Sequence, residues 1–130
     1  MKAEIAVPPG VSKRCLSTTD LGPVVMRKEY LQAEFAGREI SQLLIGERYL
    51  HLPDAELEVR FRDNEIEIST DAYARQVTFA ADGVTGAVFE DNFFDLPPGR
   101  ARTLAVVDAK GVRQITVRAL NADPIVLKAK

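Results

Sequence analysis

Residues 56–69 read Glu-Leu-Glu-Val-Arg-Phe-Arg-Asp-Asn-Glu-Ile-Glu-Ile-Ser, an alternation of charged and apolar residues around one Asp-Asn pair. Alternation with a period of two is typical of a β-strand that buries one face. Because Asp and Asn tolerate positive φ, Asp63-Asn64 predicts a two-residue hairpin turn between two such strands. The turn fixes the register, which places Phe61 opposite Ile66 on the buried side.

The solvent side of this hairpin supports the same register. Arg62 then faces Glu65 and Arg60 faces Glu67. Each cross-strand pair of opposite charges stabilises a sheet by roughly 0.2 to 1 kcal/mol. Pattern, turn chemistry and charge therefore all predict one hairpin in one register.

Other short stretches alternate in the same way. They are Ala3–Val7, Gln76–Phe79, and a second predicted hairpin from Ala101 to Ala119 whose strands are joined by Asp108–Gly111. Glycine and proline separate these stretches at regular intervals, which is typical of an all-β sandwich or barrel.

The stretch from Tyr30 to Leu52 fits two interpretations. Apolar residues at Leu31, Phe35 and Ile40 could form one stripe of a helix. Two glycines interrupt this stripe and no good cap precedes it, so strands remain the alternative.

Length and composition predict one domain over residues 1–130. The chain has a formal net charge of −2, with 46% hydrophobic and 28% charged residues, as in an ordinary soluble globular domain. Such a charge gives no reason to expect nucleic acid as a partner. The sequence has no long apolar run, so we expect neither a signal peptide nor a transmembrane helix and no membrane partner. The compartment stays open.

Residues that commonly carry chemistry are few. The single cysteine, Cys15, excludes an intrachain disulfide and is expected to be a small, half-buried hydrophobe. The single histidine, His51, has no second imidazole or cysteine near it, which favours a structural role. Most carboxylates alternate with arginines, whereas glycoside hydrolysis needs an opposed pair. We therefore predict no catalytic residue, no metal and no cofactor.

The most distinctive local segment is Asp91–Gly99, which reads Asp-Asn-Phe-Phe-Asp-Leu-Pro-Pro-Gly. Its Pro-Gly pair suits a type II turn, and Phe94 and Leu96 share one face that can fill the core. One interpretation is a rigid corner in which the polar side chains bind nearby backbone amides. The other is a substrate-binding site, whose candidate residues are Asp91, Asn92 and Asp95.

Four stretches together resemble a known family. Asp91–Gly99 is similar to a segment of the C-terminal immunoglobulin-like domain of β-mannosidases and related exo-β-glucosaminidases of glycoside hydrolase family 2. The other stretches that resemble this domain are Tyr49–Leu57, Ile68–Val77 and Val117–Asn121. The resemblance runs from about residue 26 to 121 in order, and departs from the family pattern at Pro97.

This resemblance implies an immunoglobulin-like antiparallel β-sandwich of about seven to nine strands, and strands rather than a helix over residues 30–52. It also implies a non-catalytic accessory domain that packs against the catalytic part of a parent glycosidase and borders its cleft. In such enzymes the catalytic glutamates lie in a separate (β/α)8 barrel, which needs roughly 250 residues. The alternative is a stand-alone module that binds carbohydrate or protein; a small independent enzyme is a third possibility. The sequence names neither the sugar nor the linkage.

Overall fold

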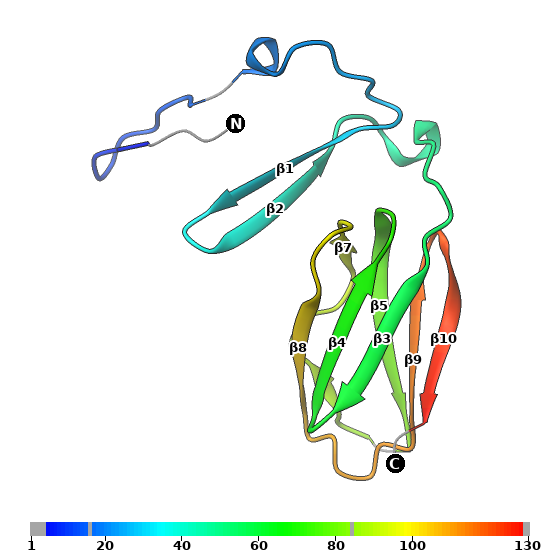
Figure 1. Cartoon of the computed structure of the whole chain (residues 1–130). Helices are drawn as coiled ribbons and strands as arrows, with labels where there is room; N and C mark the ends of the chain where they lie inside the picture. Colours follow the sequence, from blue (N-terminus) through cyan, green and yellow to red (C-terminus); the bar gives the residue numbers. More distant parts are fainter. Residues whose placement is uncertain (1–4, 16, 84, 129–130) are drawn as a thin grey trace.

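The computed structural model describes residues 5–15, 17–83 and 85–128. They form ten β-strands and two short 3₁₀ helices (Figure 1). In chain order the elements are η1 (Thr18–Leu21), β1 (Tyr30–Phe35), β2 (Arg38–Leu43), η2 (Glu47–Tyr49), β3 (Leu57–Arg62), β4 (Glu65–Thr70), β5 (Ala74–Asp82), β6 (Val88–Phe89), β7 (Phe94–Leu96), β8 (Arg102–Val107), β9 (Gln114–Ala119) and β10 (Ala122–Lys128).

Eight of the strands form a sandwich of two antiparallel sheets. One sheet has the order β3-β4-β8-β6 and the other β10-β9-β5-β7, and Figure 1 shows them as two facing layers. The apolar side chains between the sheets form the core, and the largest fully buried ones are Ile66, Ile68, Val77, Ile115 and Val117. The predicted all-β, immunoglobulin-like antiparallel β-sandwich is confirmed.

β3 and β4 form the predicted hairpin. Asp63 and Asn64 have φ values of 53° and 64°, the left-handed conformation that a two-residue hairpin turn requires. The Arg62 guanidinium pairs with the adjacent Asp63 at 3.2 Å. The register agrees with the prediction at Phe61–Ile66, Val59–Ile68, Arg60–Glu67 and Arg62–Glu65.

The second predicted hairpin, from Ala101 to Ala119, is wrong. β8 pairs with β4 and β6, whereas β9 pairs with β5 and β10, so the connection Asp108–Gly111 crosses from one sheet to the other. Alternation indicates which side chains are buried. β8 and β9 belong to opposite sheets, and each buries its apolar side chains in the core between them. Two strands that pair within one sheet would show the same alternation, so the pattern does not distinguish the two arrangements.

The stretch from Tyr30 to Leu52 forms two strands and the short η2, not one long amphipathic helix. β1 and β2 form an antiparallel hairpin that lies beyond one end of the sandwich (Figure 1). The predicted strand at Ala3–Val7 is wrong in its described part, because Ile5–Val7 is not in a strand and is exposed; residues 1–4 lie outside the described residues. Cys15 is exposed, not half-buried as expected. One domain over residues 1–130 stays a prediction.

Candidate functional site

The predicted corner, Asp91–Gly99, connects β6 to β8 and contributes the short edge strand β7. Gly99 has a φ of 93°, which a Pro-Gly type II turn requires of its third residue. Leu96 is 4% exposed and Phe94 packs against the core cluster. The rigid-corner interpretation is therefore confirmed in its backbone and its apolar face.

Asp95 is the most constrained of the three candidate residues. Its carboxylate accepts hydrogen bonds from Arg75 Nη1 at 2.6 and 2.7 Å, from the Tyr73 hydroxyl at 2.8 Å and from the Gln76 amide at 3.0 Å. Arg75 also pairs with Glu47 of η2. The carboxylate thus accepts four hydrogen bonds from three groups of the protein itself.

The ionisation of this network follows from its burial and hydrogen bonds. Burial alone would raise the pKa of Asp95, but the hydrogen bonds from Arg75, Gln76 and Tyr73, with the Arg75 charge, lower the pKa below its ordinary value. Burial raises the pKa of Tyr73 to about 12. Near neutral pH, Asp95 is therefore an anion and Tyr73 a protonated donor.

Asn92 completes a sheet ladder with its side chain. Its Oδ1 accepts from the Phe79 amide at 2.9 Å, and its Nδ2 donates to the Phe79 carbonyl at 3.1 Å. The side-chain amide of Asn92 thereby pairs with the backbone of β5 in place of a partner strand, at a position that β7 does not reach.

Asp91 is more accessible than Asp95. It accepts from the Asn92 amide at 2.8 Å and pairs with Arg102, and the two charged side chains of this pair are 42% and 38% exposed. The guanidinium of Arg102 also lies 4.0 Å above the centre of the Phe94 ring. Asp91 therefore keeps surface that a ligand could reach.

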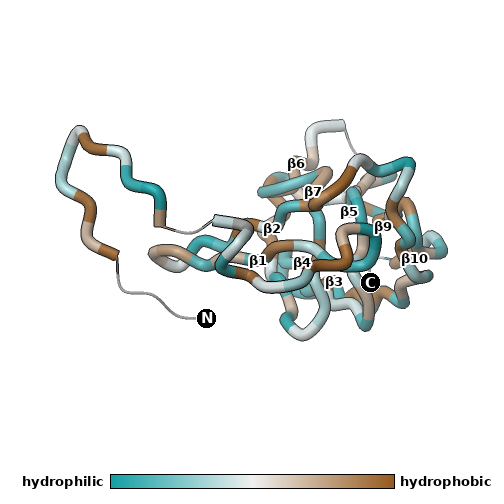
Figure 2. Tube along the Cα trace, turned by 90° about the horizontal axis from the view of Figure 1, so that it is seen from above, coloured by the Kyte–Doolittle hydropathy of each residue, from teal (hydrophilic) through white to brown (hydrophobic). Residues whose placement is uncertain are grey.

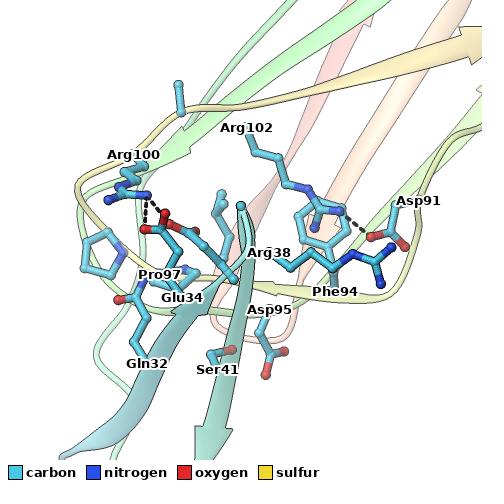
Figure 3. A pocket seen from close by; sticks show the side chains of 15 residues that line it. Gln32, Glu34, Arg38, Ser41, Asp91, Phe94, Asp95, Pro97, Arg100 and Arg102 are labelled. Carbon is cyan, nitrogen blue, oxygen red and sulfur yellow. Dashed lines mark hydrogen bonds and ion pairs between the residues drawn. The ribbon is translucent and has the colours of Figure 1, made fainter. Parts of the chain in front are cut away.

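A groove of about 700 Å³ lies between the corner and the β1–β2 hairpin (Figure 3). Asp91 and Asp95 line it, whereas Asn92 is not among its lining residues. Arg100, which follows the corner, forms ion pairs with Glu34 and Glu39 of the hairpin. The structure thus brings two of the three candidates to one groove. That any of the three binds substrate stays a prediction.

Sequence reasoning missed the partners that hold the corner. Arg75 lies at the start of β5 and Tyr73 directly precedes that strand. The register of β5 against β7 shifts between Ala74 and Val77. Gln76 has a φ of 52° within this irregularity. A bulge of this kind re-aims a side chain, and no local pattern in the sequence marks its position.

The described ranges 5–15, 17–83 and 85–128 contain neither a cluster for a metal ion nor a membrane-spanning helix. No three of the described His, Cys, Asp and Glu residues are placed to hold a metal ion. None of the helices in these ranges is long and apolar enough to cross a membrane.

Comparison with protein-family models identifies the family of the sandwich. The family model Ig_mannosidase, described as an Ig-fold domain, matches residues 52–123, more than half of the chain. The matched range contains β3 to β9 and the corner. No curated protein matches the sequence significantly.

Proposed function

Since the chain belongs to the Ig_mannosidase family of Ig-fold domains, we propose that it is a non-catalytic accessory domain of a β-mannosidase-like glycosidase. In that parent enzyme it packs against the catalytic part and borders the substrate cleft. The parent hydrolyses β-mannosides or related β-glycosides.

Besides the family, the observation that carries this proposal is that the two corner carboxylates, Asp91 and Asp95, are bound by other groups of the same chain. Glycoside hydrolysis needs one carboxyl group with a raised pKa as general acid and a second carboxylate across the scissile bond. Asp95 has a lowered pKa and is bound by Arg75, Tyr73 and Gln76. Asp91 is paired with Arg102. Both carboxylates thus support a structural role.

The test compares the isolated chain with the full-length gene product that contains it. We expect the isolated chain to unfold cooperatively and to leave an aryl β-mannoside intact, while the gene product hydrolyses it. Hydrolysis by the isolated chain that Asp91→Asn abolishes would refute a non-catalytic domain. A gene product that leaves both aryl β-mannosides and aryl β-glucosaminides intact would refute the parent enzyme.

A stand-alone carbohydrate-binding module is the second candidate, and the groove beside the corner favours it. Its lining mixes carboxylates and guanidinium groups, which can bind sugar hydroxyls from both directions. Sugar-binding sites also use open aromatic faces, and Arg102 covers the ring of Phe94 in this groove. We therefore expect that isothermal titration calorimetry detects no binding of mannan or chitosan oligosaccharides to the isolated chain. Binding that Asp91→Ala removes would favour this module.

A further inference from the structure

The β1–β2 hairpin has two faces of different chemistry. Residues directly opposite in an antiparallel pair lie on the same face, and successive pairs alternate between the faces. We call one face the inner face; its pairs are Tyr30–Leu43, Gln32–Ser41 and Glu34–Glu39. We call the other the outer face; its pairs are Leu31–Gln42, Ala33–Ile40 and Phe35–Arg38.

The inner face is turned towards the sandwich. Ser41 Oγ lies 3.1 Å from the Tyr73 hydroxyl, and the Tyr30 and Tyr73 rings are 4.4 Å apart. Nearer the hairpin turn, Arg100 binds both Glu34 and Glu39. All hydrogen bonds, ion pairs and ring contacts recorded between the described hairpin and the sandwich come from this face.

The outer face carries four apolar side chains, which are exposed except for the half-buried Leu31, whereas Arg38 at its end lines the groove (Figure 3). Phe35 is 72% exposed and Ile40 is 66% exposed, and Ala33 lies directly beside Ile40. A hairpin that belonged to the sandwich core would turn its apolar side inwards and its polar side to water. Beyond the half-buried Tyr30–Leu43 pair this hairpin does the reverse, so the apolar side chains of its outer face have no core of their own in the described structure.

Two further features extend this argument. In the described structure neither long edge of the hairpin pairs with a further strand, and an isolated two-stranded hairpin is marginally stable in water. The preceding segment extends away from the sandwich and contains stretches of hydrophobic residues (Figure 2). Its exposed large apolar residues are Ile5, Val7, Val11, Leu21, Val25 and Met26. Hairpin and segment both lie outside the matched range 52–123.

We propose that the outer face packs against the apolar face of a second β-sheet, supplied by another part of the parent polypeptide; this inference rests on the proposed function. A row of apolar side chains with a period of two suits the packing of sheet on sheet. A second copy of the chain fits less well. The four apolar side chains of this face, Leu31, Ala33, Phe35 and Ile40, cannot by themselves bury the ~1,600 Å² of a standard interface between separate molecules. A covalently linked neighbour has a high effective concentration and needs less area.

Thiol labelling tests this packing at single positions. All variants carry Cys15→Ser, and a maleimide is applied to Phe35→Cys, Ile40→Cys and the matched control Phe93→Cys. Phe93 is the control because its side chain is 74% exposed in the unmodified chain. Each variant is compared in the isolated chain, in the full-length gene product, and in the gene product unfolded by urea. Labelling is quantified by mass spectrometry on the peptide that carries the new thiol.

In the isolated chain we expect all three thiols to react at similar rates. In the folded gene product, the labelling rates at positions 35 and 40 should fall by at least about 100-fold, because a packed thiol is labelled only in rare open states. The rate at position 93 in the isolated chain supplies the exposed reference. If Phe35→Cys prevents folding, Ile40→Cys carries the same test, and the cooperative thermal transition of each variant shows which has folded.

Other results would overturn the inference. Rates at 35 and 40 in the folded gene product that equal those in the isolated chain would refute it and leave the proposed function intact. Protection that disappears on dilution would indicate a second copy instead of the same polypeptide, and would also refute it. A gene product whose mass is that of this chain alone would refute the proposed function, and the inference with it.

Discussion

Removing the Asp95 carboxylate should destabilise the sandwich far more than removing the neighbouring Asp91 carboxylate. Asp95→Ala leaves the Arg75 guanidinium, the Tyr73 hydroxyl and the Gln76 amide without their common acceptor. If Asp95 were kept to bind a ligand, its removal would leave the stability of the free protein unchanged or higher. The stability of this variant therefore separates the two interpretations of the corner.

The magnitude follows from how far the pair is buried. The side chains of Arg75 and Asp95 are 21% and 13% exposed, which places the pair between an exposed one, worth about 0 to 1 kcal/mol, and a buried one, whose disruption costs about 3 to 5 kcal/mol. We expect a loss of about 3 kcal/mol in the free energy of unfolding. For a domain of this length that lowers the Tm by about 10 °C.

Thermal unfolding followed by circular dichroism measures this loss. Asp95→Asn keeps an oxygen acceptor but loses the charge, so its loss should be about half as large. The matched control is Asp91→Ala. Its ion pair with Arg102 joins side chains that are 42% and 38% exposed, and its removal should cost about 1 kcal/mol or less. A Tm for Asp95→Ala within two degrees of the unmodified chain, or equal to that of Asp91→Ala, would refute the structural interpretation.

The lowered pKa of Asp95 contributes stability that is fully present above the ordinary aspartate pKa of about 3.9 and is lost as the pH falls through the lowered value. Denaturant titrations across acidic pH should show a shallower loss for Asp95→Asn than for the unmodified chain; identical slopes would contradict this. Phe94 is half-buried against Phe79, at 5.9 Å between ring centres, so Phe94→Ala should cost about 2 to 3 kcal/mol by the same denaturant measurement, less than a fully buried ring. Gly83→Ala should lower the Tm more than Gly99→Ala: both have positive φ, but a Cβ at Gly83 would lie 3.0 Å from the Gly111 carbonyl oxygen and one at Gly99 would contact nothing within 4 Å. Equal losses in the two glycine variants would show that the backbone near Gly83 moves to make room.

Sequence reasoning succeeded where several local signals agreed. At β3–β4 the alternation, the Asp63-Asn64 turn and the cross-strand charges all specify one register, and the structure has that register. At β8 and β9 the signals were alternation and a connection, Asp108–Gly111, that suits a hairpin loop. Apolar residues of both strands, such as Leu104 and Ile115, are buried, but strand pairing depends on contacts between distant parts of the chain. The crossing between sheets was for this reason not predicted.

The corner shows the same division between local and distant information. Its turn and its apolar face are set by neighbours in the sequence, and both were predicted. The partners of Asp95 lie about twenty residues earlier, and the pairing of β5 with β7 brings them together. The irregular register near Gln76 determines which side chain of β5 reaches the carboxylate. Without that register, the three polar corner residues could be interpreted as a site or as a brace.

The corner network also connects the sandwich to the hairpin. The Tyr73 hydroxyl donates to Asp95, so it has only its oxygen lone pairs left and accepts the hydrogen bond of Ser41 on the inner face. Arg75 binds Asp95 and, from the same guanidinium, Glu47 in the connection that follows β2. One carboxylate therefore orients two groups that hold the hairpin. An outer face that packs against a neighbouring sheet benefits from such a fixed orientation. A small interface gains little free energy, so it cannot offset a large entropic cost of ordering the hairpin when the interface forms. Asp95, which first suggested a substrate site, thus helps to fix the orientation of the hairpin on the sandwich.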